Sequence, residues 1–196
     1  GRPGPDVGPA GSGRRCGPPP AGPGRGGAVS RQRRDGRRVV RTGGRLEYRA
    51  DAPPTLEWRF PAPLGPRTVI GEFTMADVVT VPSHLSVPEV RTYMTADAAR
   101  DIASPRTPPP AAADPSGRSD QTFLVDVVVR SGSEEWRAVA RGRDIYAVTA
   151  PLVVEALERV LTGRAEAYGV VSAGEAFDAP DFLRALSAHL TVELPS

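Results

Sequence analysis

The sequence predicts an α+β fold in which a mostly antiparallel or mixed sheet is covered by two or three helices. Three observations lead to this prediction. Residues 121–130 and 134–143 alternate apolar and polar side chains around a short Ser-Gly-Ser turn, which is typical of an antiparallel strand pair. Residues 145–162 carry apolar side chains at helical spacing. Residues 167–171 are then expected to form another strand.

The helix expected within 145–162 has the clearest signals. Pro151 suits the first turn, where an N–H has no intrahelical partner, and Gly163 suits the left-handed residue that ends a helix. Glu155 and Arg159 are four residues apart, as in a favourable ion pair. Six apolar residues are expected to face the core and four polar ones to face solvent, namely Leu152, Val153, Ala156, Leu157, Val160 and Leu161 against Glu155, Glu158, Arg159 and Thr162.

Shorter elements are expected in the rest of residues 37–196. Residues 39–42 and 45–48 flank Gly43 and Gly44, a pair that suits the tight turn of a hairpin. Thr95 and Asp178 are each expected to cap a helix. The remaining expected elements are two helices and two strands, at 95–102, 178–188, 87–94 and 190–194.

Residues 1–36 differ in composition from the rest of the chain. They are rich in Gly, Pro and Arg, and Val7 and Val29 are their isolated large aliphatic residues. We predict a disordered, basic, low-complexity tail, followed by one folded domain at 37–196. The arginines at 31–38 could attract nucleic acid phosphates, but no aromatic residue is interleaved to stack bases, so a solvated tail is favoured over a nucleic acid partner. A start read out of frame stays open as another interpretation.

Composition argues against several functional classes. No apolar run approaches the ~20 residues of a membrane span, and no apolar leader segment is recognisable, so a cytoplasmic location is expected. The single Cys16 excludes an internal disulfide. His84 and His189 lack partners at ligand spacing, so no metal site is expected. Ser83 and Ser172 lie in no nucleophile motif of the G-x-S-x-G kind.

Candidate binding residues gather where the second strand of the pair leads into the helix. Arg141, Asp144, Tyr146 and Thr149 lie there, and free backbone N–H groups together with arginines favour an anion. Alternatively, Asp144 caps the helix and the arginines are solvated; the sequence favours neither interpretation. His84, at a turn that ends a β-rich stretch, is the other candidate substrate contact. The sequence assigns no catalytic residue and no cofactor-binding residue.

Three segments carry a resemblance to a known family. Arg-Gly-Arg-Asp-Ile-Tyr-Ala-Val-Thr-Ala-Pro at 141–151, the helix after it up to Gly163, and Tyr-Gly-Val-Val-Ser-Ala-Gly-Glu at 168–175 resemble the C-terminal part of saccharopine dehydrogenase-like proteins. More narrowly, they resemble bacterial proteins with a saccharopine dehydrogenase NADP-binding domain. The resemblance reaches back through 72–94 and 121–143, and so covers most of 37–196.

The resemblance implies an oxidoreductase domain organisation. In that family a Rossmann domain, with its strand, glycine-rich turn and helix, holds NAD(P), and a second α+β domain shapes the site of a small-molecule substrate. Residues 1–36 contain no such nucleotide-binding unit. The resemblance therefore implies that 37–196 is the substrate-side domain of an NAD(P)-dependent oxidoreductase, a fragment that is inactive and binds no NAD(P) by itself. The alternative is a non-enzymatic binding or dimerisation module with a basic arm, and a homodimer is compatible with both.

Overall fold

The computed structural model describes residues 37–108 and 110–195, so the tail predicted at 1–36 lies outside the described residues. The α+β class is confirmed, although the expected single sheet is divided into three antiparallel sheets. Their strands are β1 (Arg38–Thr42) and β2 (Arg45–Arg49); β3 (Thr55–Arg59), β4 (Pro66–Gly71) and β5 (Tyr93–Thr95); and β6 (Thr122–Ser131), β7 (Glu134–Arg143) and β8 (Leu190–Glu193). The helices are α2 (Asp77–Thr80), α3 (Ala96–Ala103), α4 (Thr149–Leu161), α5 (Ala173–Ala176) and α6 (Ala179–Ala185).

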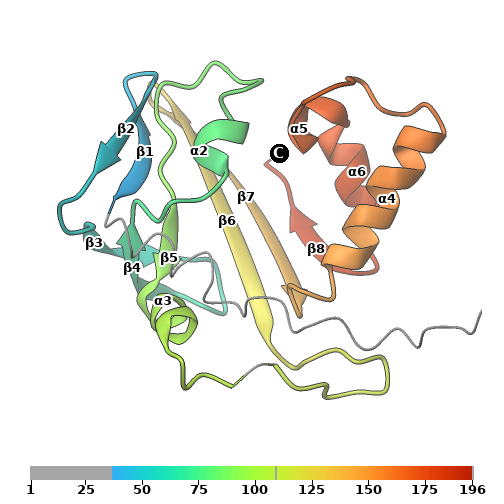
Figure 1. Ribbon diagram of the computed structural model, residues 1–196, viewed down its shortest axis with the longest axis horizontal. Coiled ribbons are helices and arrows are strands. Elements are labelled where there is room, and N and C mark those ends of the chain that lie inside the picture. Colours follow the sequence, from blue (N-terminus) through green and yellow to red (C-terminus); the bar gives the residue numbers. More distant parts are fainter. Residues whose placement is uncertain (1–36, 109, 196) are drawn as a thin grey trace, which may run out of the picture.

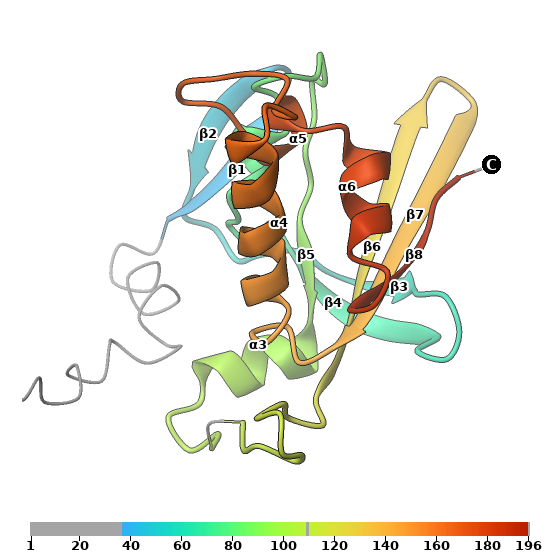
Figure 2. The ribbon, with the colours of Figure 1, turned by 90° about the vertical axis from the view of Figure 1, so that its right-hand side faces the viewer.

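These elements form layers. Figure 1 shows β6 and β7 in the middle, with β1 to β5, α2 and α3 on one side and α4, α5 and α6 on the other. In Figure 2, turned by 90°, α4 and α6 run side by side next to β8. No helix in the described part of the chain is long and apolar enough to cross a membrane. The middle sheet thus separates a region built mainly of strands from a region built mainly of helices.

The hairpin β1–β2 forms as the sequence predicts. Gly43 and Gly44 have φ angles of 57° and 78°, the left-handed backbone that a two-residue hairpin turn requires and that glycine adopts without steric cost. This turn fixes the register, which places Arg38 directly opposite Arg49. Two arginines at opposed positions repel each other unless acidic groups lie nearby, and this hairpin forms one wall of the pocket described below.

A buried acid joins the β3–β5 sheet to the middle sheet. Asp126 of β6, whose side chain is 2% exposed, accepts hydrogen bonds from Trp58 Nε1 at 2.8 Å and from Arg137 Nε at 2.7 Å. Arg137 also donates to the carbonyl of Arg59 at 2.7 Å. Burial raises the pKa of Asp126, but the hydrogen bonds from Arg137 and Trp58 lower it further, so the net shift is downward. The carboxylate therefore stays charged and connects the two sheets.

The helical layer packs on the other face of the middle sheet. One cluster of buried residues there consists of Val148, Leu186 and Leu190, and four partly buried side chains pack against it: Phe123, Leu152, Phe182 and Val192. Asp178 caps α6 as predicted, because its carboxylate accepts from the backbone N–H of Asp181 at 2.7 Å. α6 ends at Ala185, three residues earlier than expected.

The end of α4 is predicted correctly, whereas its buried face is predicted only in part: Leu152 and Ala156 are half-buried as expected, but most of the apolar residues are not. Gly163 has a φ of 72°, and the N–H of Arg164 bonds to the carbonyl of Arg159 at 2.8 Å, which closes the helix as expected. Arg159, predicted to face solvent, is 3% exposed. Glu155 at 2.7 Å and Asp181 at 2.8 Å neutralise its guanidinium, and a paired arginine can be buried. The apolar side faces outward instead, with Val153, Val154, Leu157, Val160 and Leu161 between 50% and 76% exposed.

Two predicted strands differ from the structure: the one expected at 167–171 is absent from the described residues, and the one expected at 87–94 is shorter. Residues 167–171 form no strand, because they pair with no other segment in the described part of the chain; Gly169 has a φ of 101° and Val170 is fully exposed. The strand expected at 87–94 is reduced to an isolated bridge between Val90 and Arg41, followed by β5. Thr95, expected to cap a helix, does so by accepting from the N–H of Ala98 at 3.4 Å.

Candidate functional site

A pocket of about 230 Å³ lies between the β1–β2 hairpin and the β3–β5 sheet. Strands β1 and β2 supply one wall, the segment around β5 supplies another, and Val78 of α2 closes part of the apolar side. The twelve lining residues are Val40, Arg41, Thr42, Arg49, Pro54, Leu56, Glu72, Val78, Val90, Arg91, Thr92 and Tyr93. The lining thus joins an apolar part to three arginines and one glutamate.

Glu72 is the acidic residue of this lining, and its backbone is unusual. Its φ of 55° lies in the left-handed region, which a non-glycine residue adopts at a steric cost that the surrounding structure must offset. One oxygen of its carboxylate accepts from Arg38 Nη2 at 2.9 Å, and the other accepts from Arg49 Nη1 at 2.5 Å. The side chain is 18% exposed. Glu72 therefore supplies the anion that the opposed arginines of the hairpin require.

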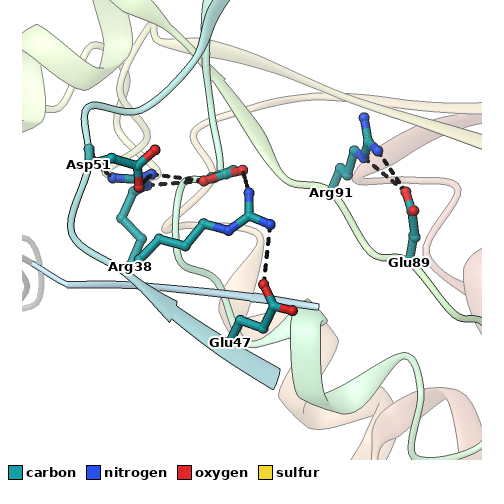
Figure 3. Close-up of polar contacts among 7 residues, drawn as sticks. Arg38, Glu47, Asp51, Glu89 and Arg91 are labelled. Atoms are coloured by element: carbon teal, nitrogen blue, oxygen red, sulfur yellow. Dashed lines mark hydrogen bonds and ion pairs between the residues drawn. The ribbon is translucent and has the colours of Figure 1, made fainter. Parts of the chain in front are cut away.

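Further acids complete this ion-pair network, as Figure 3 shows. Arg38 also reaches Asp51 at 3.0 Å, and Arg49 reaches Glu47 at 3.3 Å. The hydrogen bond that Arg49 donates to Glu47 and the charge of Glu72 raise the pKa of Arg49, which keeps its guanidinium charged. Arg38, which the sequence groups with the arginines of the tail, is thus engaged inside the fold.

Arg91 stands apart from this network, as Figure 3 also shows. Its side chain is 66% exposed, and Glu89, two residues away, accepts from its Nε at 3.1 Å and from its Nη2 at 2.7 Å. That hydrogen bond raises the pKa of Arg91. Across the pocket, Arg41 donates through Nε to the carbonyl of Val87 at 3.2 Å. Both guanidinium groups therefore lie on the pocket lining and are bonded to residues close to it in sequence.

The residues predicted at the strand-to-helix junction lie elsewhere, and none of them lines the pocket. Asp144 is buried, with a φ of 54°, and its carboxylate accepts from the backbone N–H groups of Ser119 at 2.7 Å and of Tyr146 and Ala147 at 3.1 Å. The hydrogen bonds from Ser119 and Ala147 lower its pKa to about 2. The carboxylate thus closes the turn before α4 and occupies three backbone N–H groups there, but it does not cap α4 itself, whose N-cap residue is Val148.

The other junction residues are spread over the surface. Arg141 forms an ion pair with Glu193 and donates to the carbonyl of Ala62 at 3.3 Å. Tyr146 is 54% exposed, and Thr149 donates to the carbonyl of Ile145 at 3.2 Å. The structure therefore brings Asp144 and Tyr146 together through the hydrogen bond from the Tyr146 N–H to the Asp144 carboxylate, while the Arg141 side chain points toward β8. A substrate contact at this junction stays a prediction.

His84 lies in a different place, next to two serines. Its Nδ1 is 3.0 Å from Ser172 Oγ and 3.4 Å from Ser83 Oγ, and the two serine oxygens are 3.3 Å apart. A Cβ at Gly174 would lie 2.6 Å from His84 Nε2, so this glycine is what lets the imidazole approach α5. The cluster connects the segment after α2 to the start of α5. The sequence contains no signal for this contact, because the residues are 88 positions apart.

The described residues contain no group of three or more His, Cys, Asp or Glu side chains that could hold a metal ion.

The pocket at the β1–β2 hairpin was missed by sequence reasoning, although one signal could have found it. The two-glycine turn sets Arg38 opposite Arg49, so an acidic partner is required, and Glu72 comes directly after a β-rich stretch.

Comparison of the chain with protein-family models, with curated proteins and with solved structures found no match.

Proposed function

We propose that the chain is a ligand-binding domain for a small metabolite with a carboxylate group, and that it serves as the substrate-side domain of an NAD(P)-dependent oxidoreductase of the saccharopine dehydrogenase-like kind. The observation that carries this proposal is the pocket at the β1–β2 hairpin, where Arg41, Arg49 and Arg91 outnumber the single Glu72. The oxidoreductase part of the proposal comes from the sequence resemblance, and the ligand class comes from the pocket.

The charge of the pocket favours an anionic ligand. Three guanidinium groups and one carboxylate line the pocket; beside the lining, Glu47 pairs with Arg49 and Glu89 with Arg91. Arg41 is the lining arginine that donates to a neutral backbone carbonyl. A planar guanidinium can donate two parallel hydrogen bonds to a carboxylate, which gives both affinity and orientation. Arg91 is the best placed for this role, because it lies on the lining, is largely exposed, and pairs with the exposed Glu89.

The size and the apolar part of the pocket restrict the ligand further. A volume of about 230 Å³ lies below the range of roughly 300–1,000 Å³ that is usual for drug-sized ligands. A metabolite of a few carbon atoms suits this space, whereas a dinucleotide is too large. Val40, Leu56 and Val78 would contact the carbon skeleton while the arginines hold the charged end.

The strand arrangement supports a substrate-binding role over a nucleotide-binding one for the described residues. All strand pairs among residues 37–108 and 110–195 are antiparallel. A Rossmann dinucleotide site is built on parallel strands joined by a helix. We therefore expect the protein to bind a small carboxylate and not to bind NADPH.

Isothermal titration calorimetry tests both parts of the proposal. A panel of short mono-, di- and amino-carboxylates should give at least one saturable isotherm, and NADPH should give none. Arg91→Gln should raise the dissociation constant of the carboxylate by about tenfold or more, because a charge-assisted hydrogen bond is lost. Arg100→Gln is the matched control, since Arg100 is an exposed arginine on α3 that pairs with Asp97 and does not line the pocket.

The two parts fail separately. If none of the carboxylates binds, or if Arg91→Gln and Arg100→Gln weaken binding equally, the pocket is not the ligand site. If NADPH binds with a saturable isotherm, the assignment to the substrate side of an oxidoreductase is wrong, whatever the result for the carboxylates.

A further inference from the structure

The outward face of α4 is apolar and uncovered in the described part of the chain. Val153, Val154, Leu157, Val160 and Leu161 are 59%, 62%, 54%, 50% and 76% exposed. The opposite face of the same helix is buried through Leu152, Ala156 and Arg159. Five large aliphatic side chains on one exposed helix face are more than single scattered apolar residues, and such patches mark interaction surfaces.

The spacing of this stripe is symmetric. Relative to Leu157, the other four residues lie at −4, −3, +3 and +4. A two-fold axis that lies between two copies, beside their Leu157 side chains and at a right angle to both helices, therefore places the stripe of one copy on the stripe of the other. In the pair that results, Val153 and Val154 of one copy lie against Val160 and Leu161 of the other. This is the self-complementarity that a two-fold interface between identical chains requires.

We propose that α4 pairs with α4 of a second copy of this chain, antiparallel and centred on Leu157. In the antiparallel arrangement the two helix dipoles also lie side by side and point in opposite directions, so the positive end of each is next to the negative end of the other. Glu158, at the edge of the stripe, is compensated within its own chain by Arg164 at 3.2 Å, so the pairing brings no uncompensated charge toward the axis. Apolar residues at spacings of three and four are those through which two helices pack.

Two other occupants fit less well. Residues 1–36 contain Val7 and Val29 as isolated large aliphatic residues, so this segment offers no apolar face to match the stripe. An anionic membrane surface is attracted by helices with a Lys- and Arg-rich polar face. The polar face of α4 carries Glu155 and Glu158 against Arg159, so it offers no basic surface.

The size of the patch favours a reversible pair. A standard interface buries about 800 Å² on each partner, which is more than five half-exposed aliphatic side chains provide. Ile145 before α4 and Tyr168 and Val170 after it are 51%, 72% and 109% exposed, so they can extend the contact beyond the helix ends. We therefore expect a dimer that dissociates on dilution.

Sedimentation equilibrium over a range of protein concentrations tests the pairing. The wild-type chain should change from one to two chains in mass as its concentration rises. Leu157→Glu should raise the dimer dissociation constant by at least about tenfold, because it places two carboxylates at the axis. Leu85→Glu, at a site 51% exposed on another segment, should behave as wild type. A circular dichroism melt of each variant checks that its fold is retained.

Cross-linking tests the antiparallel register. In a Cys16→Ser background, a mixture of Val153→Cys and Leu161→Cys chains should form mixed disulfide-linked dimers in preference to dimers of either variant with itself. A wild-type chain that stays monomeric at every concentration overturns the proposal, as does dimerisation that Leu157→Glu leaves unchanged. Predominant self-linked dimers overturn the antiparallel geometry, and flotation with anionic vesicles by a monomeric chain would assign the face to a membrane.

Discussion

Two acidic residues of this fold adopt the same rare backbone conformation in two different regions. Glu72, at the pocket in the strand-rich region, has a φ of 55°, and Asp144, where β7 leads into α4, has a φ of 54°. Left-handed backbone at a non-glycine residue is a feature that often accompanies function. The two carboxylates nevertheless differ in what they bind, and that difference separates a structural residue from a candidate functional one.

The carboxylate of Asp144 is occupied by backbone. It accepts from the N–H groups of Ser119, Tyr146 and Ala147, all of which have fixed positions once the chain has folded. The carboxylate of Glu72 is occupied by the side chains of Arg38 and Arg49, and each of these arginines has a second acid to which it can turn. A ligand can displace a side-chain partner but not a folded backbone, so Glu72 is the residue that can respond to a ligand.

The largest expected effect is the loss of stability on replacing Asp144. Asp144→Ala removes the carboxylate that accepts three hydrogen bonds and so takes this acceptor from the N–H groups of Ser119, Tyr146 and Ala147. We expect the thermal midpoint to fall by roughly 5–10 °C, measured by circular dichroism. The control is Asp178→Ala, which removes the single cap bond to Asp181 on exposed α6 and should cost about 1 kcal/mol. Equal losses of stability in the two variants would mean that the three hydrogen bonds to Asp144 stabilise the fold no more than the single bond to Asp178.

The next effect is a difference in acid stability. The pKa of Asp144 falls from its ordinary value of 3.8 to about 2 in the fold, so the folded state favours the ionised carboxylate. Its contribution is therefore complete above about pH 4 and is lost as the pH falls through the folded value of about 2. In urea unfolding between pH 5 and pH 2, wild type should lose more stability than Asp144→Asn. Parallel curves for the two proteins would contradict this linkage.

Local signals predicted much of this fold. The glycine pair at 43–44, the alternation in β6 and β7, and the caps at Thr95, Asp178 and Gly163 each depend on a few neighbouring residues, and the structure contains all of them. The junction residue Asp144 was left with two interpretations. The structure adds a contact that neither interpretation contained, a hydrogen bond from the N–H of Ser119, which lies 25 residues away.

What failed depends on tertiary partners. The apolar face of α4 was expected inside because hydrophobic periodicity says which residues share a face, not which face the rest of the molecule covers. The carboxylate of Asp181 from α6 and the ring of Phe182, 5.2 Å from the Arg159 guanidinium, turn the side of α4 that carries Arg159 inward. The pocket was missed for the same reason: the hairpin sets Arg38 opposite Arg49, but the rest of the lining comes from positions between 40 and 93 that only the tertiary fold brings together.

The smallest expected change in stability comes from replacing Glu72, and it sharpens the comparison most. Glu72→Gln should cost about 1 kcal/mol or less in urea unfolding, because Arg38 keeps Asp51 and Arg49 keeps Glu47. The same change removes the one negative charge from the pocket lining and one of the two acidic partners of Arg49, so carboxylate affinity should rise several-fold in calorimetry. Glu89→Gln, which removes the exposed partner of Arg91, is the control for stability. If Glu72→Gln instead weakens binding while the fold is retained, Glu72 receives a cationic group of the ligand, and the ligand is an amino acid rather than a simple carboxylate.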